Sequence, residues 1–426
     1  MKQILLLVTI LVFGANTFAQ NISFTDSSFK VKLLLADSTN FIAKNLSNVF
    51  FKVDSNADGE IQISEALEVS YLNIDNSNIS NLNEISNFTN LESLLCNNNS
   101  LTNLSLSQNT ELKTLSFFNN GISEINLNFN LELRNLQCSN NLLNNLNVSN
   151  NLLLENISCF ENNLTILDVS QNINLLGLGC SNNLLSTLNI NNNILLTYLN
   201  CSFNPINELD LSQNPDLKWL ECGGINLISN LNLSNNVNLE ILALGDSNIT
   251  SLDLSNNPLL NTLQIFGSQI TTLDLNSFPN LIYLVLFENQ NLSSLFIKNN
   301  SNEETLDLTS NPNLNFICVD DFQVSFVTSI ANNGAIVSDN CNLDNEEIVN
   351  QVVLSVYPNP TTSNIFVTSA ATIDKIEIFD MQGRIIAFKL TNSLIVDFDL
   401  SEQSPGIYFL KIITENGIKI EKIIKN

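Results

Sequence analysis

The stretch LRNLQCSNNLLNNLNVSNN, residues 133–151, contains the pattern that decides the fold. Leu94, Leu115 and Leu136 start the same short motif 21 residues apart, and the series continues along the chain with one step of 22. A second series of the motif lies halfway between the members of the first. Units of this size cannot bury an apolar side alone, so they stack into a solenoid. We therefore expect a mainly β repeat solenoid over residues 72–319, with two short strand-like segments in each turn.

Within each motif, apolar and polar residues alternate as in a strand with one buried side. Leu136 and Cys138 therefore face inward, and Gln137 faces outward. The position of Cys138 is held in other turns by cysteine or by a larger apolar residue, which favours a ladder of buried thiols that act as small hydrophobic side chains. The ladder consists of Cys96, Cys138, Cys159, Cys180, Cys201 and Cys222, and the apolar residues in the same place are Phe117, Leu244, Ile265 and Leu286.

Disulfides between neighbouring turns are the alternative for these cysteines in an oxidising compartment. Parallel side chains in register seldom offer the dihedral angle of about 90° that a disulfide needs. Buried thiols remain the favoured interpretation.

Asparagines follow both segments of each turn. Where the chain leaves a strand, backbone groups lose their sheet partners, and an inward amide can donate to and accept from neighbouring turns. We expect two ladders of hydrogen-bonded asparagines. The first ladder contains Asn99, Asn120, Asn141, Asn162, Asn183 and Asn204, and the second contains Asn109, Asn130, Asn151, Asn172, Asn193 and Asn214.

The combined motif, Leu-x-x-Leu-x-Cys-Ser-x-Asn-x-Leu followed by Leu-x-Leu-Ser-x-Asn, resembles the 21-residue leucine-rich repeats of bacteria. The resemblance includes internalin-type proteins with a cysteine ladder and covers about residues 72–319. It implies a curved scaffold that binds proteins or cell surfaces, and it implies no particular ligand.

Composition restricts the possible functions. The 426 residues include 16 basic and 42 acidic side chains and no histidine, for a net charge of −26. Nucleic acid needs a basic surface and is not an expected partner. The absence of histidine removes the commonest general acid and base, so we expect no enzyme. A glycan-processing enzyme would have to use stacked acids such as Asp253 and Asp274. A purely structural matrix protein is a further alternative.

Aromatic residues gather at outward positions of the first segments, whereas the second-segment face is uniformly polar and acidic. Exposed aromatics on a rigid scaffold are typical of surfaces that recognise protein or glycan ligands. The alternative is that aromatic residues simply favour strands. The candidate ligand-binding residues are Phe118, Phe160, Tyr198, Trp219, Phe266, Tyr283 and Phe287.

Upstream of the repeats, residues 20–71 form a predicted N-terminal cap that contains DSNADGEIQISE, residues 54–65. This stretch resembles an EF-hand or dockerin-type calcium loop, with Gly59 at the turn position. We expect one structural calcium ion, flanked by a helix over residues 40–51 and another that begins near Ser64. A capping turn that merely keeps the pattern is the alternative. The candidate ligands are Asp54, Asn56, Asp58, Glu60 through its carbonyl, Gln62 and Glu65.

Both ends of the chain carry further signals. Residues 1–19 combine Lys2, a short apolar run and a small residue at Ala19, as in a secretory signal peptide. No apolar run is long enough for a transmembrane segment.

After the last repeat, residues 320–341 form a predicted C-terminal cap, in which Cys318 and Cys341 are the best candidates for a disulfide. The acidic residues 342–351 are typical of a linker.

Residues 352–426 have a different composition, with alternating runs separated by turn residues. They predict an immunoglobulin-like β-sandwich. Four landmarks, VYPNP, IFDMQGR, LSEQSPGIYFLKI and a terminal KIIKN, resemble the C-terminal sorting domain of the type IX secretion system. An ordinary immunoglobulin-like adhesive module is the alternative.

The sorting-domain resemblance implies a Gram-negative Bacteroidetes host, contact with the type IX secretion machinery, and release from the cell or display on the extracellular face of the outer membrane. Together these features predict a secreted or cell-surface leucine-rich repeat binding or adhesion protein, whose ligand is a protein or glycan on a cell surface.

Overall fold

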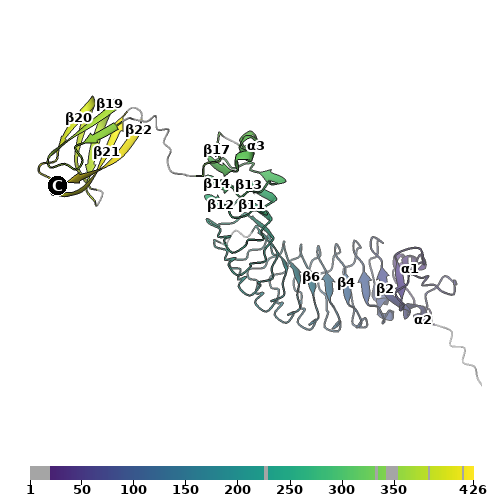
Figure 1. The fold of residues 1–426 in the computed structure, drawn as a ribbon. Coiled ribbons are helices and arrows are strands. Elements are labelled where there is room, and N and C mark those ends of the chain that lie inside the picture. The colour runs from purple at the N-terminus through teal and green to yellow at the C-terminus, as the bar shows by residue number, and fades with distance from the viewer. Residues whose placement is uncertain (1–19, 225–228, 332–333, 342–353, 382–383, 415–416) are drawn as a thin grey trace, which may run out of the picture. The chain divides into compact units, whose positions relative to one another are not determined.

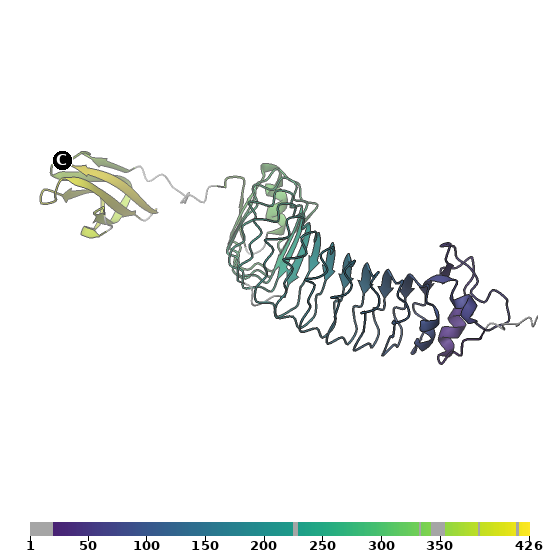
Figure 2. The ribbon, with the colours of Figure 1, turned by 90° about the horizontal axis from the view of Figure 1, so that it is seen from below.

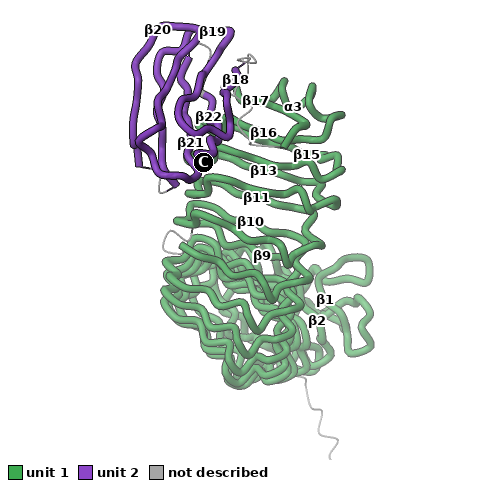
Figure 3. Tube along the Cα trace, turned by 60° about the vertical axis from the view of Figure 1, so that its left-hand side comes forward, with its two compact units in different colours: residues 1–341 green, residues 342–426 purple. Residues whose placement is uncertain are grey.

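The computed structural model describes residues 20–426 except 225–228, 332–333, 342–353, 382–383 and 415–416. The chain divides into two compact units, Met1–Cys341 and Asn342–Asn426 (Figure 3). The expected signal peptide and linker lie outside the described residues. In the part of the chain that the structure describes, none of the helices is long and apolar enough to span a membrane.

A sheet of thirteen strands runs the length of the first unit. From β2 onward its strands are parallel, and Leu115, Leu136 and Ile157 pair in register across three turns. This stacking confirms the predicted solenoid, and Figures 1 and 2 show the strands along the inner side of the curved stack. The strands are β1 (Ala43–Asn45), β2 (Val69–Asn73), β3 (Ser93–Leu95), β4 (Thr114–Ser116), β5 (Asn135–Gln137), β6 (Asn156–Ser158), β7 (Gly177–Gly179), β8 (Tyr198–Asn200), β9 (Trp219–Gly223), β10 (Ile241–Gly245), β11 (Thr262–Phe266), β13 (Tyr283–Phe287) and β15 (Thr305–Asp307).

The cysteine ladder lies inside the solenoid as predicted. All six ladder cysteines are free and buried, so the alternative of disulfides between turns is wrong. Burial raises the pKa of the Cys138 and Cys201 thiols to about 12, which keeps them protonated and unreactive near neutral pH. The ladder therefore acts by packing.

The two asparagine ladders join successive turns, but they differ in how completely they are hydrogen-bonded. Asn141 Nδ2 donates to the carbonyl of Phe117 at 3.0 Å, and its Oδ1 accepts from the amide of Ile122 at 3.1 Å. Asn151 Nδ2 donates to the carbonyl of Leu127 at 3.1 Å, but its Oδ1 is buried without a partner among the described residues. Both ladders replace backbone partners that the chain loses at its corners.

Over most of the solenoid, the second strand-like segment of each turn does not form a hydrogen-bonded strand. A second parallel sheet forms only near the C-terminal end, from β12 (Thr272–Asp274), β14 (Ser294–Ile297), β16 (Phe316–Val319) and β17 (Ile336–Ser338). Alternation of apolar and polar residues determines which way side chains face, and extended backbone satisfies it without a ladder of hydrogen bonds. A stack that bends toward one sheet spreads its turns on the opposite side, where strands cannot keep the spacing of about 4.8 Å that pairing needs.

The N-terminal cap differs from the predicted one. Residues 40–51 do not form a helix, because β1 pairs antiparallel with β2 and the chain then turns at Asn48, whose φ is 61°. Asn45 Oδ1 accepts from the amide of Val49 at 3.1 Å, which shows how asparagine side chains compete with helical bonds. The helices of the cap are α1 (Ser27–Leu34), which Asp26 caps, α2 (Ile63–Ala66), which begins beside Ser64 as expected, and the 3₁₀ helix η1 (Asn83–Asn87).

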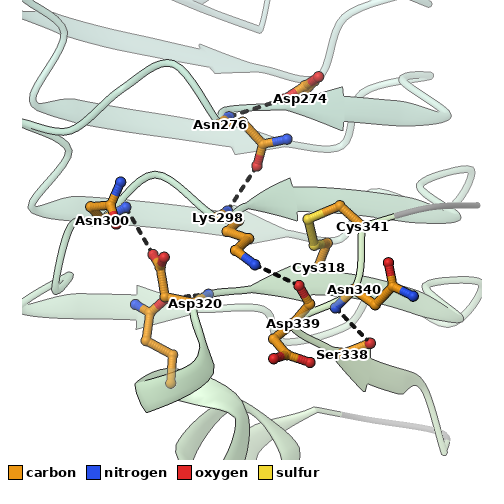
Figure 4. The surroundings of a disulfide bond; sticks show 11 residues. Asp274, Asn276, Lys298, Asn300, Cys318, Asp320, Ser338, Asp339, Asn340 and Cys341 are labelled. Carbon is orange, nitrogen blue, oxygen red and sulfur yellow. Dashed lines mark hydrogen bonds between the residues drawn. A yellow bond between two sulfur atoms is a disulfide. The ribbon is translucent and has the colours of Figure 1, made fainter.

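The C-terminal cap contains η2 (Asp321–Gln323), α3 (Val324–Ile330) and β17. Figure 4 shows Cys318 of β16 joined to Cys341 by a disulfide, with Cα atoms 5.2 Å apart. Lys298 Nζ donates to the carbonyl of Asp339 at 2.7 Å beside it. These links hold the end of the first unit against the last turns.

The second unit is an antiparallel β domain, as the alternating runs predict. Its strands are β18 (Leu354–Tyr357), β19 (Asn364–Phe379), β20 (Ile385–Asp399), β21 (Gly406–Thr414) and β22 (Gly417–Lys425). They pair in the order β18-β19-β21-β22, and β20 pairs with β19. The core includes Ile365, Val367, Ile376, Ile378, Leu410, Ile412 and Ile423. The immunoglobulin-like arrangement of two packed sheets stays a prediction.

Candidate ligand-binding face

The outward side of the long sheet, here called the outward face, carries all seven predicted aromatic residues. Parallel pairing in register places their positions in rows that run along the solenoid. Tyr198, Trp219 and Tyr283 share one row. The exposed fractions are 42% for Trp219, 41% for Phe160 and 36% for Tyr283 and Phe287, while Phe118, Tyr198 and Phe266 are half-buried.

Tyr198 and Trp219 form the best-defined aromatic pair on this face. They are partners in register between β8 and β9, and their ring centroids lie 5.4 Å apart at an interplanar angle of 87°. This edge-to-face geometry fixes both rings beyond what burial alone would do. Partial burial, with a smaller contribution from the Glu221 carboxylate, raises the pKa of Tyr198, so its phenol is neutral at physiological pH. The pair is a rigid, half-open platform.

A hollow of about 430 Å³ lies beside this platform, over β5 to β8. The residues that line it include Gly177, Gly179, Phe160 and Tyr198. Sequence reasoning missed the hollow, although two glycines at the outward positions of one strand are the signal that could have found it. Its size is within the range of about 300–1,000 Å³ that is usual for ligand pockets.

Phe266 has a structural role that its outward position did not predict. Its ring lies over Gly245 and Gly223 of the two preceding turns and fills the space that a Cβ on Gly245 would need. Phe203 covers Gly224 in the same way. Some aromatic residues of the outward face therefore pack against the chain itself, and the most open platform is the part around Phe160, Tyr198 and Trp219.

The predicted calcium loop is folded, and hydrogen bonds link several of the side chains named as ligands. Asp54 and Glu65 are each only 5% exposed. Asp54 Oδ1 accepts from the Asp58 amide at 3.2 Å, and Glu65 Oε1 accepts from the Ser55 amide at 2.7 Å. Asn56 Nδ2 donates to Asp58 Oδ2 at 3.0 Å and to Gln62 Oε1 at 3.1 Å, so these three side chains are linked within the loop.

A metal site made of acidic, histidine or cysteine side chains alone is not found. Among the described residues, no three side chains of these types are gathered so that they could hold a metal ion. The loop would also need the amide oxygens of Asn56 and Gln62 and the carbonyl of Glu60. An all-oxygen donor set of this kind fits calcium.

Asp253 and Asp274, the acids considered for glycoside hydrolysis, accept hydrogen bonds from nearby backbone amides. Asp253 Oδ1 accepts from the Ser255 amide at 2.9 Å, and Asp274 Oδ1 accepts from the Asn276 amide at 3.0 Å. The bond from Ser255 lowers the pKa of Asp253. A general acid needs a raised pKa, so Asp253 is not suited to that role. Both side chains form turns at the ends of their segments.

Comparisons with known proteins agree with both units. Residues 355–426 match the family described as secretion system C-terminal sorting domain, which indicates secretion through the outer membrane. A comparison with curated proteins gives no match.

The solved structures that are similar to the chain include two internalins. An internalin, InlF, from Listeria monocytogenes is 18% identical over 75% of this chain and 96% of its own, with a TM-score of 0.50. The functional domain of InlJ from Listeria monocytogenes, which includes a cysteine ladder, is 21% identical over 96% of this chain and 98% of its own, with a TM-score of 0.38. The likeness to InlF shows the internalin-type leucine-rich repeat fold. The chain thus combines this solenoid with a secretion sorting domain.

Proposed function

We propose that this protein is a secreted or cell-surface binding protein that recognises a protein or glycan ligand through its outward face. The observation that carries the proposal is the half-open pair of Tyr198 and Trp219 beside a hollow on a rigid sheet. Aromatic residues fixed at partly open positions supply large contact areas at a small cost in conformational entropy.

The chemistry of the outward face supports binding more than catalysis. Glu221 and Asn200 are bonded to each other, with Asn200 Nδ2 donating to Glu221 Oε2 at 2.6 Å. Burial raises the pKa of Glu221. The partner of its carboxylate in this bond is the Asn200 amide and not a second acid, as a pair of catalytic acids would require. Amide and aromatic groups of this kind are suited to holding a ligand in place.

We propose further that residues 352–426 direct export by the type IX secretion machinery, and that the protein is released or displayed on the outer surface. The match of residues 355–426 to the sorting-domain family supports this proposal. A fusion of these residues to a periplasmic reporter tests it in a host with the machinery. Export of the reporter is expected, and retention in the periplasm would contradict the sorting role.

The binding proposal is tested by probing a glycan array and an array of host proteins with the full chain. Binding is expected to fall at least tenfold in a variant with Tyr198→Ala and Trp219→Ala, because both rings are partly open. Ile166→Ala is the matched control, since Ile166 is 73% exposed and lies in a second segment, away from the outward face. Equal binding by wild type and the double variant would exclude the outward face.

We also propose that the loop of residues 54–65 binds one structural calcium ion, which would be held by Asp54, Asn56, Asp58, the Glu60 carbonyl, Gln62 and Glu65. The buried carboxylates of Asp54 and Glu65 support this, because burying two charges is costly and Lys52 Nζ, 3.7 Å from Asp54 Oδ2, can offset only one of them. Calcium would neutralise the acids and tie the loop to α2. Calorimetric titration of the calcium-stripped full chain should show binding that Asp54→Ala abolishes, and no heat with the wild type would reject the site.

A further inference from the structure

The glycines of β7 have no explanation within the fold. Gly177 and Gly179 hold the two outward positions of the strand, where the next turn carries Tyr198 and Asn200. Glycine weakens a strand and usually marks a bulge or a close approach of something else. No bulge is present, because β7 pairs in register with both neighbours.

Crowding by the protein does not explain these glycines either. A Cβ on Gly179 would meet no atom closer than 3.8 Å, which is ordinary contact. A Cβ on Gly177 would meet the Oδ1 atom of Asn156 at 2.8 Å, the movable end of a side chain. Gly223 and Gly245 are different, because the ring of Phe266 fills the space above them. Both glycines line the hollow, Gly177 half-buried and Gly179 buried, and the hollow has room for a group from outside the chain.

The lining of this hollow indicates what that group is. Asn156, Asn182 and Gln137 present side-chain amides, and Phe160 and Tyr198 present rings. Within the described residues, no hydrogen bond engages the Asn182 side-chain amide or Gln137 Nε2. These groups can therefore bond to hydroxyl groups as donors and, at Asn182, also as acceptors.

Charge excludes an acidic ligand. The described residues that line the hollow include the carboxylate of Glu161 and neither lysine nor arginine, and the whole chain has a net charge of −26. An anion would be repelled by this surface without a cationic partner. An apolar protein anchor would leave the amides of the lining unpaired, which is unfavourable.

We propose that the hollow over β7 is a subsite for a neutral sugar residue of an extracellular polysaccharide. One apolar face of the ring packs against Phe160 or Tyr198, the ring hydroxyls bond to the amides, and the glycines let the sugar approach the backbone. This inference rests on the proposed binding function and names the ligand class for that face.

The test uses the full chain and five probes: maltohexaose, cellohexaose, mannohexaose, chitohexaose and the anionic hexagalacturonate. Trp219 is the single tryptophan of the chain, and it contacts Tyr198 at the edge of the hollow, so its emission reports binding, with calorimetry as the second measurement. At least one neutral probe is expected to bind, and hexagalacturonate is not.

Two matched variants distinguish loss of binding caused by filling the hollow from loss of binding caused by a general change in the sheet. Gly179→Val places methyl groups in the hollow and is expected to weaken binding of the neutral probe at least tenfold. Ala243→Val gives the same side chain in the same row, three turns further along, and should change binding less than twofold. Thermal unfolding of both variants checks that each folds, and Tyr198→Ala supplies a second loss-of-binding variant if Gly179→Val does not.

Unchanged binding in Gly179→Val and Tyr198→Ala, or binding of hexagalacturonate alone, would overturn the sugar subsite. If none of the oligosaccharides binds while array binding still depends on Tyr198 and Trp219, the subsite is wrong and the proposed function stands. If array binding is also insensitive to Tyr198 and Trp219, both are wrong.

Discussion

The ring of Phe266 covers Gly245 on the neighbouring strand, and the two residues are partners in register between β10 and β11. The ring therefore takes the space above the sheet that a side chain at residue 245 would occupy. Gly179 occupies an outward position without such a cover. The two glycines should respond in opposite ways to the same substitution.

Gly245→Ala should lower the free energy of unfolding by about 1–3 kcal/mol, because the added methyl group overlaps the Phe266 ring. Gly179→Ala should be neutral or stabilise the protein by about 0.5 kcal/mol, since alanine loses less backbone entropy in a strand. Urea denaturation measures both. In a double-mutant cycle, Phe266→Ala should remove most of the cost of Gly245→Ala, and additive costs would show that the ring is not the cause.

The repeat phase allowed much of this fold to be predicted from sequence. Leu136 and Cys138 face inward as their place in the cycle requires, and the same argument located the outward aromatics. The cover of Gly245 by Phe266 was not predicted, because phase determines which side a residue faces but not how far a large ring reaches across its neighbours. The hollow over β7 could not be predicted for the same reason, because it depends on how far the neighbouring side chains reach.

Local errors had other physical causes. The helix expected over residues 40–51 competes with the turn at Asn45 and Asn48, and the side-chain bonds of asparagine favour the turn. The true helix α1 follows Asp26, whose Oδ1 accepts from the Ser28 amide at 2.8 Å. An N-cap residue ahead of an apolar run was the signal for it.

The buried thiols should make the protein less stable in alkaline solution. Below about pH 9, thiols are protonated in both the folded and the unfolded chain. Above it, thiols of the unfolded chain lose protons, while Cys138 and Cys201 keep theirs up to a pKa of about 12. The unfolded state then binds fewer protons, so the free energy of unfolding falls by about 1.4 kcal/mol per thiol and pH unit.

Other groups also titrate in this range, so the comparison is made against a variant with Cys138→Ala and Cys201→Ala. Between pH 8 and pH 10, the variant should lose about 3 kcal/mol less stability than the wild type in urea denaturation. The same dependence on pH in both proteins would mean that these thiols ionise in the folded state.

The two asparagine ladders should contribute different amounts to the free energy of unfolding. Asn141→Ala removes the acceptor for the Ile122 amide, which is left unpaired inside the solenoid. It also removes one donor to the Phe117 carbonyl, which keeps its bond from Asn120 Nδ2 at 3.0 Å. Asn151→Ala removes donors to the carbonyls of Leu127 and Asn130, which keep bonds from backbone amides. The oxygen that it removes had no partner among the described residues. We expect Asn141→Ala to cost about 1 kcal/mol more than Asn151→Ala. Chemical denaturation of the two variants measures this difference, and equal costs would show that the acceptor bond to Ile122 adds nothing.

Removal of calcium should destabilise the N-terminal cap if the loop of residues 54–65 holds the ion. A ligand present at 100 times its dissociation constant stabilises the folded state by about 2.7 kcal/mol, so a chelator should lower the melting temperature of the wild type. Asp54→Ala should melt at the temperature of the chelated wild type and show no further response to chelator. Glu92→Ala changes an acid outside the loop, one that pairs with Lys113 at 3.0 Å on the surface, and should keep the full response. A wild type that melts at the same temperature with and without chelator would mean that the folded loop is held by its own hydrogen bonds, such as that from the Ser55 amide to Glu65.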